Sequence, residues 1–359
     1  MSSKLFSPVS VGKLNLQHRI VLAPMTRFKA GKDDGVPHVP CMREYYSQRG
    51  SAAGTLLITE ATIIAPQAGG YPHVPGIWSS EQVAAWKEIV DGVHACGSYV
   101  YLQLWALGRT APPSDVKLVS ASDIPMSGGR SEKPTPLTKE EIQEYIQLHA
   151  TAAHNAVFGA GFDGVEIHGA NGYLIDQFIQ DVSNKRTDEY GGSIENRARF
   201  ALEIVKAVAD SVGAERTALR LSPWSPFQDM KMDDPKPTFA YITSQLVQHH
   251  PNLAYLHVIE PRIAGYNNAE GDGAESNDFI REIWAPRPYM TAGGYVRKNA
   301  MEAADKKGEL VAIGRYFISN PDLVRRLKED IPLADYDRST FYVPGEFSGK
   351  GYTDFPFAP

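Results

Sequence analysis

Short apolar, β-rich runs recur along this chain of 359 residues, and helical patterns fill the gaps between them. Several of the runs are almost continuously apolar, which is typical of strands in a parallel sheet that is covered on both faces. Eight strands are predicted, at Ile20–Thr26, Thr55–Ile63, Tyr99–Trp105, Gly164–His168, Thr217–Ser222, Ala254–Ile259, Tyr289–Ala292 and Leu310–Tyr316.

The segments between these strands carry recognisable helix starts. Thr138 and Glu141 have the spacing of a capping box, as do Ser79 and Gln82, and apolar residues follow each pair at helical spacing. A further apolar stripe runs through residues 194–208. The other predicted helices are Pro40–Arg49, Asp234–His249, Asn277–Trp284, Arg297–Asp305 and Pro321–Glu329.

Strand and helix alternate eight times without a low-complexity linker, which favours a closed (β/α)8 TIM barrel in a single domain over residues 1–359. A doubly wound sheet is the alternative, but no GxGxxG motif follows the first strand. An N-terminal hairpin before Ile20 is expected to close the barrel bottom. We expect the Pro- and Gly-rich segment of about 106–137, after strand three, to form a cap. The tail of about 333–359 is expected to wrap the outside.

Charge and cysteine content limit the partners and the compartment. Against 36 Lys and Arg there are 42 Asp and Glu, and this net charge of −6 provides no footprint for nucleic acid and no polybasic patch for a membrane. Cys41 and Cys96 are the two cysteines, without a CxxC motif or a Cys/His cluster, so neither a metal site nor a disulfide framework is expected. No signal peptide or membrane-spanning run is evident, and a cytoplasmic location is expected.

The most distinctive polar group follows the fourth predicted strand. His168, Asn171 and Tyr173 lie where that strand opens into a loop, at the edge where parallel α/β proteins bind ligands. His and Asn both donate hydrogen bonds to a carbonyl oxygen, and a Tyr phenol, with an ordinary pKa of about 10, is a proton donor at neutral pH. This pattern indicates chemistry on an activated carbonyl compound. The alternative is an ordinary Asn-Gly turn with Tyr173 packed in the core.

Glycines and an arginine end the last two strands. Barrels often bind phosphate in the loops after strands seven and eight, where Gly293, Gly294 and Gly314 allow close backbone approach and Arg315 adds a charged contact. The alternative is that these are ordinary turn residues.

Gln103 and Arg220 are polar residues on otherwise apolar strands. A buried Arg needs an anionic partner, so Arg220 either forms an internal salt bridge, with Glu166 or Glu260, or faces an electron-rich ring that becomes anionic on reduction. Four aromatic residues either form walls around such a ring or pack in the core or at the rim: Tyr71, Trp105, Phe227 and Tyr266.

Together these motifs resemble the old yellow enzyme family of FMN-dependent ene reductases, in its fungal branch. The resemblance covers nearly the whole chain, and the block from Asn184 to Phe200 is highly specific. The matching segments are Leu5–Ser7, Ala23–Thr26, Tyr101–Trp105, Asp163–His168, Asn171–Leu174, Asn184–Phe200, Arg220–Pro223, Gly314–Leu323 and Tyr336–Arg338.

The resemblance implies a role for each matching position. It implies that the cofactor FMN is lined by Pro24, Met25, Thr26 and Ala61. The pyrimidine ring of FMN would be bound by Gln103 and Arg220, and its phosphate by Gly293, Gly294, Gly314 and Arg315. His168 and Asn171 would bind the substrate carbonyl oxygen, and Tyr173 would protonate the substrate. Further substrate-pocket positions match at Tyr71, Trp105, Phe227 and Tyr352.

The implied reaction is an ene reduction. NADPH would reduce FMN, and hydride would pass to the β-carbon of an α,β-unsaturated aldehyde or ketone while Tyr173 protonates the α-carbon, in a monomer or homodimer. The chain is shorter than yeast members in the cap and over residues 225–236, and it differs over residues 263–271, so substrate preference does not transfer. A pathway-specific reductase of fungal secondary metabolism, of the ergot-alkaloid type, is a second candidate. There, Phe at the acid position accompanies isomerase behaviour, and Tyr173 favours net reduction. A flavin-binding protein without turnover is a third candidate.

Overall fold

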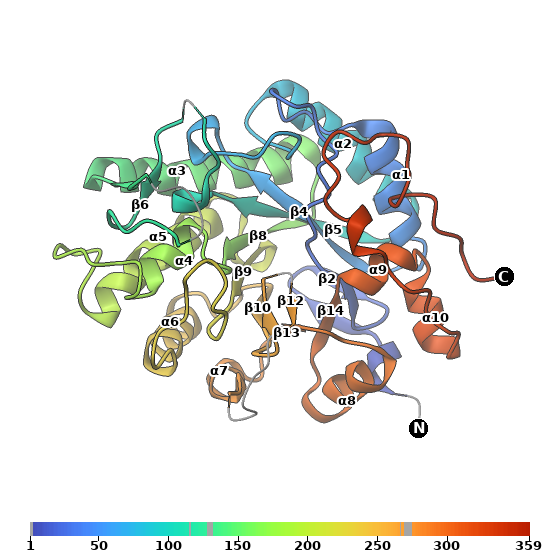
Figure 1. Ribbon diagram of the computed structural model, residues 1–359. Helices are drawn as coiled ribbons and strands as arrows, with labels where there is room; N and C mark the ends of the chain where they lie inside the picture. The colour runs from blue at the N-terminus through green and yellow to red at the C-terminus, as the bar shows by residue number, and fades with distance from the viewer. Residues whose placement is uncertain (1–2, 115, 128–131, 266, 269–274) are drawn as a thin grey trace.

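The computed structural model describes residues 3–114, 116–127, 132–265, 267–268 and 275–359. A closed barrel of parallel strands forms the centre of this described part (Figure 1). Around the barrel the strands follow in the order β3 (Ile20–Leu22), β4 (Leu56–Ile63), β5 (Tyr99–Trp105), β8 (Gly164–Gly169), β9 (Thr217–Leu221), β10 (Tyr255–Ile259), β13 (Tyr289–Ala292) and β14 (Leu310–Ile313). The TIM barrel expected from the sequence is therefore confirmed.

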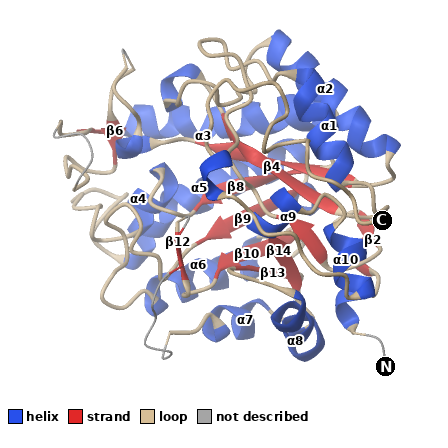
Figure 2. Ribbon diagram, turned by 45° about the vertical axis from the view of Figure 1, so that its right-hand side comes forward, coloured by secondary structure: helices blue, strands red, loops and turns tan. Residues whose placement is uncertain are grey.

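Helices surround the strands on the outside of the barrel (Figure 2). The two predicted capping boxes are present, at Ser79 before α2 and at Thr138 before α3. The helices are α1 (Val39–Arg49), α2 (Ser80–Ala95), α3 (Lys139–His154), α4 (Leu174–Ile179), α5 (Ile194–Val212), α6 (Lys236–His249), α7 (Asp278–Trp284), α8 (Arg297–Lys307), α9 (Arg315–Ser319) and α10 (Leu323–Glu329). A π-helical turn, Asn155–Ala160, continues α3.

The first and last barrel strands are shorter than predicted. The first was expected to reach Thr26 but ends at Leu22, because Pro24 has no N–H with which to continue the ladder. The last was expected to reach Tyr316 but ends at Ile313, where Gly314 leaves the β conformation and α9 begins at Arg315. Both corrections place predicted flavin-binding residues beyond the strand ends, with Pro24, Met25 and Thr26 on a loop and Arg315 in the first turn of α9.

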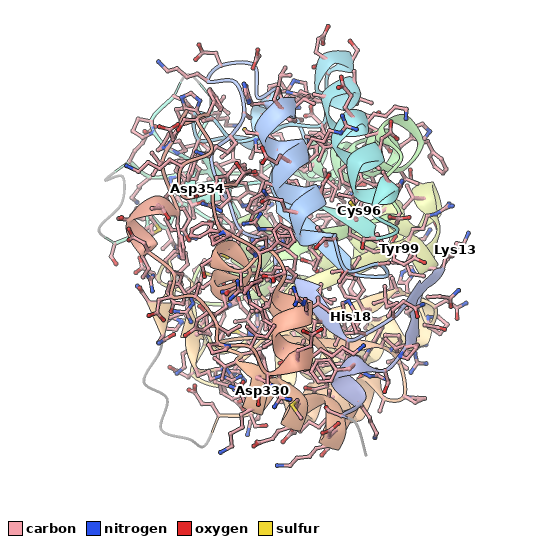
Figure 3. All side chains as sticks on the ribbon, turned by 90° about the vertical axis from the view of Figure 1, so that its right-hand side faces the viewer. Lys13, His18, Cys96, Tyr99, Asp330 and Asp354 are labelled. Carbon is pink, nitrogen blue, oxygen red and sulfur yellow. The ribbon has the colours of Figure 1, made fainter. Side chains whose placement is uncertain are left out.

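The expected N-terminal hairpin closes one end of the barrel. Its strands, β1 (Val9–Val11) and β2 (Leu14–Leu16), pair antiparallel, and their buried side chains pack with the apolar base of the barrel interior. Lys13 at the hairpin turn lies on the opposite side of the molecule from Asp354 of the C-terminal segment (Figure 3). The hairpin therefore leaves the carboxyl ends of the barrel strands accessible for a site.

The described parts of the expected cap, residues 106–137, and of the expected tail, residues 333–359, lie around the barrel (Figure 1). The segment expected to form a cap contains a short parallel pair, β6 (Val119–Ser120) with β7 (Thr135–Pro136), beyond the end of β5. The tail was expected to wrap the outside of the barrel, but its residues Phe341 and Tyr352 are buried in the molecule. No helix in the described ranges has the length and apolar character to cross a bilayer.

Candidate active site

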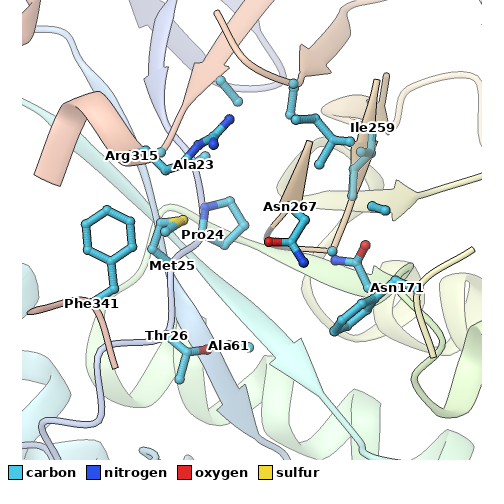
Figure 4. A pocket seen from close by; sticks show the side chains of 18 of the residues that line it. Ala23, Pro24, Met25, Thr26, Ala61, Asn171, Ile259, Asn267, Arg315 and Phe341 are labelled. Atoms are coloured by element: carbon cyan, nitrogen blue, oxygen red, sulfur yellow. The ribbon is translucent and has the colours of Figure 1, made fainter. Parts of the chain in front are cut away.

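A cavity of about 1210 Å³ opens at the carboxyl ends of the barrel strands. Each of the eight barrel strands, or the loop that follows it, contributes to its wall. Ligand pockets are typically about 300–1,000 Å³, so this cavity has room for a cofactor and a substrate together. Across it, Asn171 faces the segment of Pro24, Met25 and Thr26 (Figure 4).

The predicted site residues gather in this one cavity, although they come from distant parts of the sequence. The exception is Tyr352. Those that line the cavity are Pro24, Met25, Thr26, Ala61, Tyr71, Gln103, Trp105, His168, Asn171, Tyr173, Arg220, Phe227, Gly293, Gly294, Gly314 and Arg315.

Tyr352 was expected in the substrate pocket but lies elsewhere. Its ring is fully buried and stacks on Tyr45 at a centroid distance of 4.1 Å. The guanidinium of Arg27 lies 4.9 Å from the same ring. This is a packing position behind the cavity wall, and we leave Tyr352 out of the site. Tyr266, expected as an aromatic wall, is outside the described residues.

His168 is placed to donate a hydrogen bond into the cavity. The N–H of Ala170 donates to its Nδ1 at 3.4 Å, which leaves the ring proton on Nε2. Burial, together with the positive charge of Arg220, lowers the pKa of His168 well below its usual value. The imidazole is therefore neutral at physiological pH and has one N–H to offer.

Tyr173 lies against His168 and Trp105. Its ring is 4.9 Å from each of the other two rings, edge-on to both. Burial raises the pKa of the phenol above its ordinary value, with the neighbouring Tyr71 adding to the shift. Tyr173 therefore stays protonated, and it is a weak acid that gives up its proton only to a strongly basic partner.

Side chains from other elements hold the loop between His168 and Tyr173. Asn171 has φ of 59° and Gly172 has φ of 76°, a left-handed pair that needs external support. Asp176 Oδ2 accepts from the N–H of Gly172 at 2.8 Å, and Gln177 Nε2 donates to its carbonyl oxygen at 2.7 Å. Both peptide groups of Gly172 are thus held by α4, which fixes the direction of Asn171.

Asp176 and Gln177 were not among the predicted site residues, and their signal was available in the sequence. Both are polar residues flanked by the apolar Ile175 and Phe178. Both are fully buried. The wall residues that follow α10 belong to a segment without strand or helix periodicity, and a signal was available only for Tyr336 and Arg338, through the family resemblance. They are Tyr336, Arg338, Phe341 and Tyr342.

The floor of the cavity is polar. Gln103 Nε2 donates to Glu166 Oε1 at 2.7 Å, and His257 Nδ1 lies 2.8 Å from Glu166 Oε2. Burial alone would raise the pKa of Glu166, but His257, Arg220 and Gln103 together hold it below the usual range. The carboxyl group is therefore ionised at the centre of the barrel.

Arg220 does not form the internal salt bridge considered from the sequence. Glu166 is engaged by His257 and Gln103, and Glu260 pairs with Arg281. Within the described part of the chain, the Nε atom of Arg220 is buried without a hydrogen-bond acceptor. Trp105 Nε1 and Asn171 Oδ1 are buried in the same cavity and have no partner among the described residues. Such groups are costly unless a ligand completes them.

The loop after β3 is anchored from below. The N–H of Arg27 donates to Glu60 Oε2 at 3.1 Å, and β4 shifts register between Ile58 and Ala61, which turns Ala61 toward the cavity. Burial raises the pKa of Glu60 to about 7. The backbone beside Thr26 is therefore fixed by a buried carboxyl group.

The opposite rim combines glycines with arginines. Gly293 has φ of 148° and Gly294 has φ of 61°, and a Cβ at Gly293 would lie 2.9 Å from the Glu260 side chain. The Nη2 of Arg315 donates to Asn268 Oδ1 at 2.9 Å. Backbone without side chains at Gly293 and Gly294, beside a guanidinium that is held by Asn268, suits a phosphate group.

The sequence matches one protein family over almost its full length. The model of the NADH:flavin oxidoreductase / NADH oxidase family matches residues 4–334. The chain belongs to this family.

Relatives of this flavin oxidoreductase include several fungal proteins. It is 51% identical to a chanoclavine-I aldehyde reductase of Penicillium roqueforti, over 99% of this chain and 97% of the relative. An NADP-dependent oxidoreductase of Aspergillus flavus is 48% identical, over 100% and 97% of the two chains. A probable inactive dehydrogenase of Claviceps fusiformis is 47% identical, over 99% and 95%.

Solved structures agree with the old yellow enzyme resemblance. Old Yellow Enzyme from Pichia sp. superposes on this flavin oxidoreductase with a TM-score of 0.89 at 39% identity, covering 99% of this chain and 94% of that chain. Morphinone reductase in complex with tetrahydroNAD gives a TM-score of 0.88 at 37% identity, covering 99% and 98%.

The residues of the cavity fit FMN, the cofactor of this family. The unpartnered Nε of Arg220 and the amide of Gln103 are complementary to the acceptors and donors of a flavin pyrimidine ring. Gly293, Gly294 and Arg315 form an open, cationic rim for the phosphate. The protein is thus an FMN-dependent, NAD(P)H-using oxidoreductase.

Proposed function

We propose that this protein is an ene reductase that reduces the C=C bond of α,β-unsaturated aldehydes or ketones with electrons from NAD(P)H. One observation carries the proposal: a neutral His168, Asn171 and the half-buried phenol of Tyr173 share a cavity that fits FMN. Bound FMN supplies the hydride chemistry, accepting hydride from the nicotinamide and passing it to the β-carbon of the substrate. The side chains supply orientation, hydrogen bonds and a proton.

His168 and Asn171 bind the substrate carbonyl oxygen. The Nε2–H of His168 and the amide N–H of Asn171 are both hydrogen-bond donors. Because negative charge develops on that oxygen as the β-carbon is reduced, these donors bind the transition state more strongly than the ground state. Loss of one such donor costs about 10²–10³ in rate in other enzymes.

Tyr173 gives its phenolic proton to the α-carbon. The raised pKa of the phenol keeps the proton in place until carbanion character develops on the substrate. The edge-on contacts with His168 and Trp105 fix the ring. A rigid acid beside the carbonyl-binding pair therefore completes net reduction.

Substitution of Tyr173 by Phe tests this function. The variant should accept electrons from NADPH as fast as the wild type, because that step needs no proton from Tyr173. Reoxidation by 2-cyclohexenone should slow by about 10²–10⁴-fold, the usual contribution of a general acid. Anaerobic stopped-flow absorbance of the flavin resolves the two steps.

Tyr145→Phe is the matched control, since it removes a buried phenol on α3 that donates to the Gln67 carbonyl oxygen outside the cavity. Both of its half-reactions should match those of the wild type. If enone reoxidises Tyr173→Phe at the wild-type rate, Tyr173 is not the acid.

A pathway-specific reductase of fungal secondary metabolism is the second candidate. The similarity to a protein named as a chanoclavine-I aldehyde reductase favours it. Steady-state kcat/KM for chanoclavine-I aldehyde should then exceed that for simple enones such as 2-cyclohexenone by orders of magnitude. Comparable values would favour a broad ene reductase.

A flavin-binding protein without turnover is the third candidate, and the similarity to relatives named as probable inactive enzymes favours it. The complete set of His168, Asn171 and Tyr173 argues against it, because flavin binding alone needs no proton donor. Purified protein should be yellow, lose its colour with NADPH under anaerobic conditions, and recover it when enone is added. Failure to recover would favour the inactive alternative.

Three further properties concern the reductant, the oligomeric state and the location of the protein. We propose NADPH as the preferred reductant, in line with the NADP-dependent relative, and comparison of kcat/KM for NADPH and NADH tests this. A monomer or homodimer is proposed, to be measured by light scattering.

A cytoplasmic location is also proposed. It is consistent with the free thiols of Cys41 and Cys96, and imaging of a tagged protein tests it.

A further inference from the structure

A layer of polar side chains separates the apolar base of the barrel from the cavity. It comes from four neighbouring strands: Gln103 on β5, Glu166 on β8, Arg220 on β9 and His257 on β10. Gln103 and Arg220 line the cavity, whereas Glu166 and His257 are fully buried and do not reach it. The pair therefore acts on a bound ring only through the two residues in front of it.

Glu166 determines which end of the Gln103 amide faces the cavity. Its Oε1 accepts from Gln103 Nε2 at 2.7 Å, and its Oε2 is 2.8 Å from His257 Nδ1. Because a carboxylate only accepts hydrogen bonds, the amide nitrogen of Gln103 must point toward Glu166. The Oε1 atom of Gln103 is thereby left as an acceptor for a ring N–H.

Glu166 also offsets the charge of Arg220. The guanidinium is permanently charged and buried, and Glu166 exerts the largest favourable electrostatic effect on it. Burial lowers the pKa of His257, so this histidine is neutral and adds no charge. With Glu166 ionised, the layer is close to neutral overall; without it, the layer carries one uncompensated positive charge.

We propose that Glu166 is a positioning residue that sets the reduction potential of the bound flavin, by fixing the amide of Gln103 and by compensating the charge of Arg220. The inference rests on the proposed flavin site. A positive charge beside the ring stabilises its reduced form more than its oxidised form, because reduction adds negative charge. The carboxylate behind Arg220 weakens this effect and keeps the flavin a stronger reductant.

The test is Glu166→Gln, measured in the flavin-loaded protein. Gln has the same shape, and the unpartnered Nε2 of His257 allows the other tautomer, so His257 Nδ1 is able to accept from the new amide while Gln103 stays in place. We expect the reduced-to-oxidised ratio at a fixed potential to rise at least tenfold, which is an upward shift of about 30 mV for two electrons. Spectroelectrochemical titration measures it without turnover.

Two further variants separate charge from structure. Glu309→Gln removes a buried carboxylate that pairs with Arg281 outside the cavity, and it should leave the potential unchanged. Glu166→Asp keeps the charge but shortens the reach to Gln103. Its potential should stay within about 30 mV of the wild type, while its dissociation constant for FMN, measured by fluorescence titration, should rise severalfold.

The inference is overturned if Glu166→Gln leaves the potential unchanged, if Glu309→Gln raises it equally, or if Glu166→Asp raises it as much as Gln does. If Glu166→Gln does not fold, the proposal is tested by the potential and the FMN dissociation constant of Glu166→Asp. Failure of the proposed function would look different: wild-type protein would not bind FMN, or its flavin would not be reoxidised by enone.

Discussion

Asp176 is a buried carboxyl group directly below the loop that carries Asn171 and Tyr173. One of its oxygens accepts from the N–H of Gly172 and the other from Gln180 Nε2, each at 2.8 Å. Burial raises its pKa from 3.8 to about 7, and the hydrogen bonds and the charge of Arg109 only partly oppose this. The loop that presents the carbonyl-binding amide thus depends on a group that titrates near neutral pH.

The raised pKa of Asp176 predicts a stability that falls with pH. Between about pH 4 and about pH 7 the folded chain binds this proton and the unfolded chain does not, so the free energy of unfolding decreases as pH rises. Above about pH 7 the contribution is lost and the curve levels. Each such group contributes a slope of at most about 1.4 kcal/mol per pH unit.

Urea unfolding over pH 4.5–8 measures this slope, and Asp176→Asn should make it less negative than in the wild type. Glu60, whose pKa is also raised by burial to about 7, contributes with the same sign as Asp176, whereas His18, whose pKa is lowered by burial to about 4, contributes with the opposite sign. An unchanged slope in Asp176→Asn would show that the carboxyl group of Asp176 does not titrate in this window.

Among the elements, the segment after α10 shows how buried arginines bind a chain whose regular structure is limited to the 3-10 turn Arg338–Thr340. Arg27 donates to the carbonyl oxygens of Phe341 and Gly351 at 3.0 and 2.7 Å. Arg49 donates to the carbonyl oxygen of Tyr352 at 3.1 Å. These bonds satisfy backbone oxygens that a β-ladder would otherwise satisfy, and they hold the Phe341 side of the cavity wall.

Arg27→Met should detach this wall. Loss of charge-assisted hydrogen bonds, each contributing about 1.5–3 kcal/mol, should lower the free energy of unfolding by about 3 kcal/mol or more. Because Phe341 lines the cavity, KM for the enone should rise more than kcat falls. Lys350→Met, an exposed change on the same segment, should alter neither quantity. Equal stability of the two variants would contradict the assigned role of Arg27.

At the scale of the whole molecule, folding and cofactor binding are linked through the cavity. A ligand that binds only the folded chain stabilises it, by about 2.7 kcal/mol when its free concentration is 100 times its dissociation constant. FMN should therefore raise the free energy of unfolding measured by urea. Removal of FMN by dialysis should reverse the effect.

Riboflavin, which lacks the phosphate, is the matched ligand for this experiment. At the same concentration it should stabilise the protein less than FMN, because the rim of Gly293, Gly294 and Arg315 has no anion to bind. The difference should shrink in Arg315→Met. Equal stabilisation by both ligands in the wild type would show that this rim does not bind the phosphate.

The sequence alone determined the barrel and the type of chemistry. Apolar runs and capping residues are local signals, since a strand buried on both faces must be apolar and a helix start must satisfy its own N–H groups. The eight strands and the capping boxes at Ser79 and Thr138 were therefore readable along the chain. His168, Asn171 and Tyr173 were readable because they end one strand.

The tertiary structure decided what depends on contacts between distant segments. It placed Tyr352 behind the wall and brought Phe341 into it, because buried arginines far along the chain bind that backbone. It excluded an internal salt bridge between Arg220 and Glu166, because Glu166 is engaged by Gln103 and His257. Burial, which has no meaning before folding, then set the protonation states of His168, Tyr173 and Asp176.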